Sequence, residues 1–391
     1  MDGFIVFVLS VAAWVGHACV WVSLLNNLYG RPLSKKFLKR WRLFTGVVIV
    51  AFPAILASPL LTFEFGGQYA SLWFIAGFWT GAVVGYTVLC LIIGGLVFPA
   101  ITVARLRRKI PDCVASRTRT RDLWPELGAQ LIGDGHFAQA ARLPGNGIFR
   151  VDFTELTLTL PELPPEWDGL TLLVLSDLHF HGTPSRLFFD TIIGELASGP
   201  VPDLVCLLGD YVDTDTHHAW IVPILGRLTA TEAKLAILGN HDVYHNPDRV
   251  RAELATAGYT VIGNTWREVT IRGVRCVVVG HEGPWFASEP DLTAAPRDTF
   301  RLALSHTPDN LDWATANDIR LMLCGHVHGG QIRLPGIGSI FVPSVYGRRY
   351  DTGVFEKSGT VMAVSRGLSG KEPLRFRCNP QVLRITLRRV V

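Results

Sequence analysis

Three long apolar runs near the N-terminus constrain the fold of this chain more than any other feature. They cover residues 4–25, 43–61 and 72–103. A helix needs about 20 apolar residues to cross the hydrocarbon core of a bilayer, so each run has roughly the required length. The third run is longer and would cross at a tilt or extend past the bilayer. We therefore expect residues 1–104 to form a bundle of about three transmembrane helices.

Basic residues flank these runs unevenly. The segment 31–42 carries six Lys or Arg residues and no acid, whereas the segment 62–71 carries none. After the third run, residues 105–121 carry seven basic residues and one acid. Because Lys- and Arg-rich loops stay in the cytoplasm, we expect the C-terminal portion to be cytoplasmic, at a bacterial inner membrane. The same flanks would attract the anionic head groups of the lipid bilayer.

The charge balance outside these two flanks excludes a broad basic surface. The rest of the chain holds 24 basic and 32 acidic residues. Proteins that bind nucleic acid through its phosphate backbone need an excess of basic side chains. No nucleic-acid partner is therefore expected.

The pattern of apolar residues in the sequence changes at about residue 153. Short runs rich in Val, Leu and Ile predict buried strands at 171–176, 204–208, 235–238, 274–280, 302–305 and 321–324. Stretches with helical spacing lie between them. This alternation predicts an α/β layered domain over residues 153–391. Residues 105–152 then form a basic juxtamembrane connector with weak helical character.

Polar side chains follow five of the predicted strands. In chain order they are Asp177 and His179, Asp210, Asn240 with His241 and Asp242, His306, and His326 with His328. In open α/β sheets, binding sites form at the carboxyl ends of the strands, so these groups can converge on one cleft.

The residue types indicate a site for two metal ions. Asp, His and Asn ligands without Cys suit a divalent pair such as Mn²⁺, Fe²⁺ or Zn²⁺. Asp177 and His179 are two residues apart, which in an extended segment points both side chains the same way, and His326 and His328 repeat the spacing. Asp210 could bridge two ions. Two metals about 3.5–4 Å apart hold the attacking and leaving oxygens of a displacement at phosphorus.

Together, the five motifs resemble the calcineurin-like metallophosphoesterase family over about residues 170–388. The resemblance implies a four-layer αββα sandwich. It also implies that Asp210 bridges the metals, with one held by Asp177, His179 and His328 and the other by Asn240, His306 and His326. His241 resembles the family's catalytic histidine, and Asp242 would orient its imidazole.

Two assignments within this resemblance have alternatives. His281 and His306 both follow predicted strands, and His306 matches the family's Ser-His-x-Pro pattern better. Arg348 and Arg366 lie in a C-terminal tail that resembles the membrane-associated branch of the family. They could bind the substrate phosphate, or they could be ordinary surface arginines.

The membrane-associated branch implies a lipid-linked substrate. It suggests a UDP-2,3-diacylglucosamine pyrophosphatase, which yields lipid X and UMP in lipid A biosynthesis. A phosphodiesterase or phosphatase for other phospholipids, nucleotides or phosphoproteins is an alternative. From another class, the chain could be a membrane sensor or transporter with a regulatory phosphoesterase domain. The apolar runs offer this last hypothesis only His17 and the kinks at Pro53 and Pro59.

Overall fold

The computed structural model describes residues 3–65, 70–286 and 288–390, with side chains outside residues 55–80. The chain divides into an N-terminal unit, Met1–Lys109, and a C-terminal unit, Ile110–Val391.

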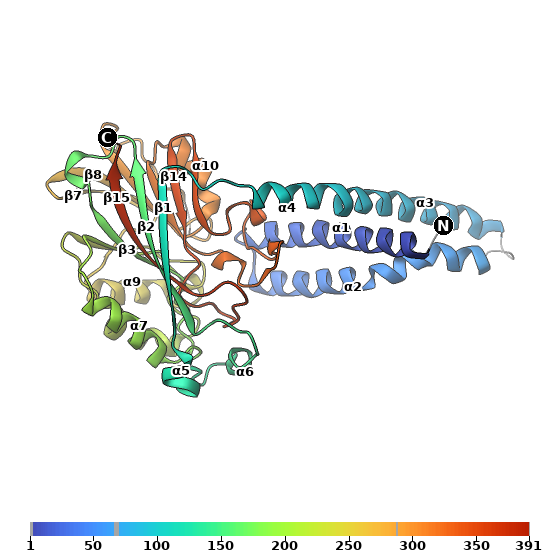
Figure 1. The fold of residues 1–391 in the computed structure, drawn as a ribbon, viewed down its shortest axis with the longest axis horizontal. Helices are drawn as coiled ribbons and strands as arrows, with labels where there is room; N and C mark the ends of the chain where they lie inside the picture. The colour runs from blue at the N-terminus through green and yellow to red at the C-terminus, as the bar shows by residue number, and fades with distance from the viewer. Residues whose placement is uncertain (1–2, 66–69, 287, 391) are drawn as a thin grey trace. The chain divides into compact units, whose positions relative to one another are not determined.

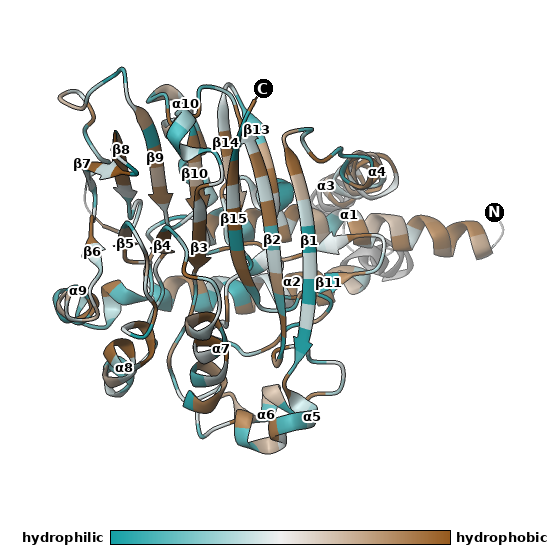
Figure 2. Cartoon of the chain, turned by 60° about the vertical axis from the view of Figure 1, so that its left-hand side comes forward, coloured by the Kyte–Doolittle hydropathy of each residue, from teal (hydrophilic) through white to brown (hydrophobic). Residues whose placement is uncertain are grey.

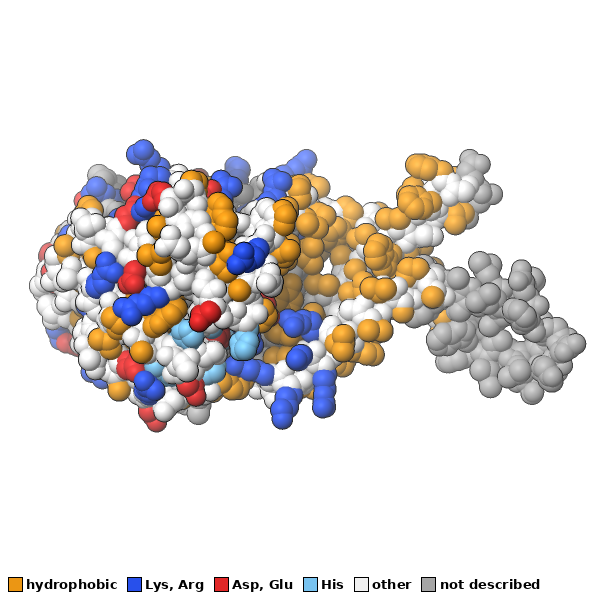
Figure 3. All heavy atoms as spheres, turned by 90° about the horizontal axis from the view of Figure 1, so that it is seen from below, with side chains coloured by type: hydrophobic (Ala, Val, Ile, Leu, Met, Phe, Trp, Pro, Cys, Tyr) orange, Lys and Arg blue, Asp and Glu red, His pale blue; other side chains and the backbone are white. Residues whose placement is uncertain are grey.

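The N-terminal unit is built from long apolar helices. These are α1 (Gly3–Tyr29), α2 (Lys35–Phe65) and α3 (Ala70–Ile92), which continues through a π-helical turn (Ile93–Val97) into α4 (Phe98–Leu106). Within the described part of the chain, two helical stretches, Gly3–Tyr29 and Gly81–Leu106, have the length and hydropathy to cross a membrane. Figure 2 colours most residues of the described helices as hydrophobic, and Figure 3 shows hydrophobic side chains along the visible face of these helices. The predicted second run lies within α2, and the side chains of its residues 55–61 lie outside the described part of the chain.

The helices α1 and α3 approach closely through glycines. A Cβ atom added to Gly16 would lie 1.8 Å from the carbonyl oxygen of Cys90, and one added to Gly94 would lie 1.9 Å from that of Ala12. Small residues allow such contact between membrane helices. The imidazole of the neighbouring His17 contacts the Tyr86 hydroxyl at 2.8 Å and the Val48 carbonyl at 3.2 Å. His17 therefore links three helices as a packed, hydrogen-bonded side chain.

The C-terminal unit contains two large β-sheets (Figure 1). The seven-stranded sheet has the order β1 (Val114–Asp122), β2 (Arg150–Leu160), β15 (Gln381–Arg389), β3 (Thr171–Leu175), β4 (Leu204–Leu207), β5 (Ala233–Ala236) and β6 (Thr260–Val261). The six-stranded sheet has the order β13 (Gly353–Lys357), β14 (Thr360–Val364), β10 (Leu321–Cys324), β9 (Phe300–Ser305), β8 (Val274–His281) and β7 (Thr265–Ile271). A small ribbon joins β11 (Arg333–Leu334) to β12 (Gly338–Ser339).

Alternating strand residues build three cores. Leu172 and Val174 of β3 face the other sheet, where they pack with Leu302 and Leu304 of β9. The intervening Leu173 belongs to the core beneath α7 (Arg186–Ser198), α8 (Ile221–Leu225) and α9 (Pro247–Thr256). A third core lies between the six-stranded sheet and α10 (Leu311–Ala316). Successive strand residues face opposite sides of a sheet, so each sheet packs against the other sheet on one face and against helices on its other face. The predicted αββα sandwich is therefore confirmed.

The predicted connector of residues 105–152 is different in the structure. Its residues 114–122 form β1, which pairs antiparallel with β2 along its whole length. Two further short helices follow, α5 (Trp124–Leu127) and α6 (Ala138–Ala141). The strict alternation of Arg and Thr over residues 117–121 is the strand signal that the weak-helix interpretation missed. Arg119 and Arg121 form ion pairs with Glu195, both at 2.5 Å.

Candidate functional site

The residues that follow the strands meet at one edge of the two sheets. Strands β3, β4 and β5 are mutually parallel, as are β9 and β10, so their carboxyl ends lie together. The side chains that follow are almost fully buried, with exposed fractions of 0% for Asp177, His179 and His306, 1% for Asp210 and 5% for His326. A cluster of buried carboxylates and imidazoles is costly unless its members compensate one another or bind an ion.

The backbone at these positions is strained. Asp177, His179, Asp210, His326 and His328 all have positive φ values, between 47° and 68°. Residues other than glycine rarely adopt this region, and each such position costs on the order of 1–3 kcal/mol. The extended geometry expected for the Asp-x-His and His-x-His pairs is therefore wrong. The side chains converge because each segment turns at the end of its strand.

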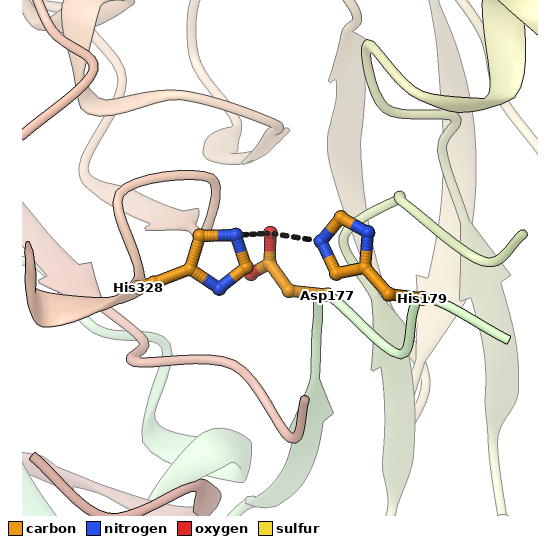
Figure 4. Close-up of side chains that lie close together, drawn as sticks. All are labelled: Asp177, His179 and His328. Carbon is orange, nitrogen blue, oxygen red and sulfur yellow. Dashed lines mark ion pairs between the residues drawn. The ribbon is translucent and has the colours of Figure 1, made fainter. Parts of the chain in front are cut away.

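The first group contains Asp177, His179 and His328. Figure 4 shows both imidazoles pointing toward the Asp177 carboxylate between them. The Nε2 atoms of His179 and His328 lie 4.0 and 3.7 Å from Asp177 Oδ1. The ligand atoms of all three residues lie within 4.8 Å of one another. The structure thus brings together the three residues predicted to hold one metal.

The second group contains Asp210, His306 and His326, whose ligand atoms also lie within 4.8 Å of one another. His306 Nε2 lies 3.4 Å from Asp210 Oδ2 and 2.9 Å from Asn240 Oδ1. Asp210 Oδ2 also lies 3.5 Å from His179 Nε2, which belongs to the first group. Asp210 therefore lies between the two groups, where a bridging carboxylate has to be.

Buried polar atoms without a hydrogen-bond partner indicate whether this site fits metal ions. His179 Nε2, Asp210 Oδ2 and His326 Nε2 are buried and have no hydrogen-bond partner among the described residues. Such atoms cost about 1–3 kcal/mol each when nothing satisfies them. All three belong to the groups of possible ligand atoms. Their nitrogen and oxygen donors suit borderline divalent ions, so the residues fit a metal pair.

The partner of His241 is Asp213, not Asp242 as expected. One oxygen of Asp213 accepts a hydrogen bond from Nδ1 of His241, and the other accepts from Nδ1 of His179 at 3.0 Å. Burial by itself would raise the pKa of Asp213, but the two imidazoles outweigh it and hold this pKa well below its usual range. Asp213 is the last residue of the Gly-Asp-x-x-Asp motif, which was its only signal in the sequence.

Among the residues that the structure describes, Asp242 bonds to backbone amides and not to an imidazole. Its carboxylate accepts hydrogen bonds from the backbone N–H groups of Asp210 and Tyr211, both at 2.9 Å, and of Gly239 at 2.8 Å. These amides belong to the loops after β4 and β5. Asp242 therefore fixes the two loops relative to each other and does not touch the His241 ring through a hydrogen bond that the structure records.

Asp242→Ala should lower the free energy of unfolding by about 3 kcal/mol, since it leaves four backbone amides, those above and that of Val212 at 3.3 Å, without their acceptor. Thermal unfolding of the detergent-solubilised protein measures the effect. Asp215→Ala is the control, because the Asp215 side chain is 75% exposed and its loss should cost less than about 0.5 kcal/mol. Equal melting temperatures for the two variants would contradict the role given to Asp242.

His281 lies outside both groups. Its Nδ1 accepts hydrogen bonds from Asn310 Nδ2 at 3.0 Å and from the Gly283 amide at 3.2 Å, and its ring packs against Trp313. Burial lowers the pKa of His281 to about 4, so the ring is neutral near pH 7. The choice of His306 over His281 agrees with this geometry.

The two tail arginines are engaged within the protein. Arg348 donates to the carbonyl of Ile337, and Arg366 pairs with Asp152 at 2.8 Å. These contacts do not support the interpretation of either residue as a phosphate ligand. A third arginine, Arg375, had no signal in the sequence. It is fully buried, donates to the carbonyl oxygens of His328 (3.0 Å) and Ser369, and lies 3.3 Å from His328 Nδ1.

Arg375→Met should weaken metal binding about ten- to a hundredfold, because residues that fix a ligand's orientation typically have this effect. Titration of Mn²⁺ into the metal-free protein by calorimetry measures it. Arg377→Met is the matched control, since Arg377 is exposed. An unchanged affinity in a folded Arg375→Met variant would show that this arginine does not position His328.

Comparison with known proteins identifies similar chains. Residues 170–330, which contain every residue of both groups, match the family model for calcineurin-like phosphoesterases. An uncharacterized metallophosphoesterase of Bacillus subtilis, YkuE, is 32% identical over 61% of this chain and 86% of its own length. The phosphodiesterase YaeI of Escherichia coli is 31% identical over 55% of this chain and 81% of its own.

A third relative extends the similarity beyond the C-terminal unit. A Bos taurus protein, named transmembrane protein with metallophosphoesterase domain, is 24% identical over 81% of this chain and 74% of its own length. This share exceeds the part of the chain that Ile110–Val391 makes up. The alignment therefore reaches into the N-terminal helices.

Proposed function

Because this chain belongs to the calcineurin-like metallophosphoesterase family and is a metal-dependent phosphoester hydrolase, we propose that it is anchored in a membrane and cleaves a lipid-linked substrate. The proposed bond is a phosphodiester or pyrophosphate, as in UDP-2,3-diacylglucosamine. The observation that carries the hydrolase site is the set of unpartnered buried atoms on His179, Asp210 and His326.

Each of the two groups of ligands would hold one metal ion. Asp177, His179 and His328 would hold one ion, and Asn240, His306 and His326 the other, with Asp210 shared between them. Bound divalent ions would supply Lewis acidity and an activated water at this site. The left-handed backbone at five of these residues sets the directions of their side chains before any ion binds.

His241 is placed to interact with the substrate. Its Nδ1 is engaged by Asp213, and its side chain is 16% exposed. Asp213 accepts from Nδ1 of His241, so the other ring nitrogen, Nε2, points away from this carboxylate and is available to the substrate. We assign His241 to stabilise charge on the phosphoryl oxygens or to protonate the leaving oxygen. Asp213 acts through His241 as a positioning residue.

The membrane helices support a lipid-linked substrate. Anchoring concentrates a hydrolase where such molecules lie, and the Bos taurus relative is likewise named as a transmembrane protein. The basic segments that flank the helices favour a cytoplasmic C-terminal unit. The site residues are shared across the family and do not select the leaving group. A second candidate is therefore a phosphodiesterase or phosphatase for other phospholipid, nucleotide or phosphoprotein substrates. The Escherichia coli relative is named as a phosphodiesterase.

Detergent-purified protein with Mn²⁺ should release UMP from UDP-2,3-diacylglucosamine, and a chelator should stop the reaction. Chromatography of the nucleotide product measures it. His241→Ala should lower the rate about a hundredfold or more, whereas the exposed Asp215→Asn should not. Absence of UMP release, with intact hydrolysis of an aryl phosphodiester, would discard this substrate in favour of the second candidate.

A further inference from the structure

Trp285 lies beside the second group of metal-binding residues. The centre of its indole ring is 4.6 Å from that of His326 and 5.6 Å from that of His306. The ring is half-buried and follows β8 in a short segment, Glu-Gly-Pro-Trp-Phe. No role for this residue emerged from the motifs.

Core packing does not explain this position. The adjacent Phe286 packs against the core beneath α7, α8 and α9, and the half-buried Trp266 and Trp313 pack against the core beneath α10. Trp285 belongs to none of the hydrophobic cores that the described residues form. Its recorded ring contacts are with two histidines of the site.

The segment that carries Trp285 is fixed to the site. The carboxylate of Glu282, only 1% exposed, accepts hydrogen bonds from the backbone amide of Leu238 at 2.7 Å and from Arg251 at 3.0 Å. Leu238 immediately precedes the loop that bears Asn240 and His241. The segment that carries Trp285 is therefore tied to the loop that bears the predicted catalytic histidine, and the indole itself lies against His326 and His306.

We propose that Trp285 is an aromatic subsite that stacks against a nucleobase of the substrate. This inference rests on the proposed function and narrows its substrate class to nucleotide-containing phosphodiesters or pyrophosphates. An acyl chain needs a continuous apolar groove, but the exposed residues that follow Trp285 are polar, including Ser288, Glu289 and Asp291. A single indole among polar groups suits one planar ring with polar edges.

Two esters that share a leaving group test the subsite. They are the para-nitrophenyl phosphodiester of thymidine and methyl para-nitrophenyl phosphate, hydrolysed with Mn²⁺. Wild type should favour the thymidine ester, and Trp285→Leu should reduce this kcat/KM preference about tenfold. Trp285→Phe keeps a planar ring and should retain most of it. Trp313→Leu, the same change at a half-buried tryptophan away from the site, should leave the preference unchanged.

A loss that is equal for both esters would overturn the proposal, since it would make Trp285 a structural residue. An unchanged ratio would overturn it as well. Trp285→Met supplies a second non-planar variant if the Leu variant does not keep the wild-type melting temperature. If wild type hydrolyses neither ester, calorimetric binding of UMP to the Mn²⁺-loaded protein decides on the subsite. The proposed function fails only if UMP release from UDP-2,3-diacylglucosamine is absent as well. Binding about tenfold weaker in the non-planar variant supports it, and equal binding overturns it.

Discussion

Asp210→Asn should abolish hydrolysis, lowering kcat on the order of a thousandfold or more. Asp210 Oδ2 lies within 3.5 Å of His179 Nε2 and 3.4 Å of His306 Nε2, so it is the carboxylate oxygen that contacts both groups of ligands. An asparagine removes the negative charge that two adjacent divalent ions need between them. Metal analysis of the purified protein should find fewer than two bound ions per chain, beside the loss of activity.

The fold should survive this substitution. Asp210 Oδ1 accepts the backbone N–H of His241 at 2.7 Å, and the amide oxygen of asparagine can accept the same bond. Circular dichroism and the melting temperature of the variant are therefore expected to resemble those of wild type. If Asp210→Asn retained two ions per chain and wild-type turnover, the shared-ligand assignment would be wrong.

Asp213→Asn should lower kcat about a hundred- to a thousandfold at saturating metal, a typical loss for a residue that supports general acid–base chemistry. Asp213 uses its two oxygens to accept from Nδ1 of His241 and Nδ1 of His179, whereas asparagine offers one acceptor oxygen and one donor –NH2. One of the two imidazoles therefore loses the partner that holds its orientation. Steady-state rates of the variant and wild type measure the effect.

A double variant separates this role from a general loss of structure. If Asp213 acts through His241, then Asp213→Asn combined with His241→Ala should be no slower than His241→Ala alone. Independent, multiplying losses would refute the assignment. The single variant Asp242→Asn is the informative comparison, because Asp242 is next to His241 in the sequence but bonds to backbone amides of two loops.

The sequence predicts Asp242 as the hydrogen-bond partner of His241, whereas the structure shows Asp213 in that place. Adjacency in sequence is therefore a poor guide to hydrogen-bond partners. Asp242 begins a short 3₁₀ turn, Asp242–Tyr244, which directs its carboxylate to the backbone amides of Asp210 and Gly239. Asp213 lies 28 residues before His241, yet parallel pairing of β4 with β5 brings the two loops together. The two aspartates belong to two different motifs, Gly-Asp-x-x-Asp and Gly-Asn-His-Asp, and only this pairing decides which one meets the imidazole.

The choice between His281 and His306 depends on strand register. In the pairing of β8 with β9, His281 lies opposite Ser305, so His306 is displaced by one residue. Because successive strand residues face opposite sides, a displacement of one residue sends the two side chains in different directions. A sequence pattern could favour His306, but only the register explains why His281 bonds to Asn310 and does not reach the site.

The sequence by itself determined the α/β class, the apolar helices, the buried strands and the polar residues that end them. Hydrophobic periodicity and chain length carry that information locally. Tertiary structure alone decided that Asp213 supports His241, that Arg375 and Trp285 adjoin the ligand groups, and that residues 114–122 complete a sheet. These contacts join distant loops and an edge strand, whose positions depend on how two sheets pack, and nothing in their local sequence records that packing.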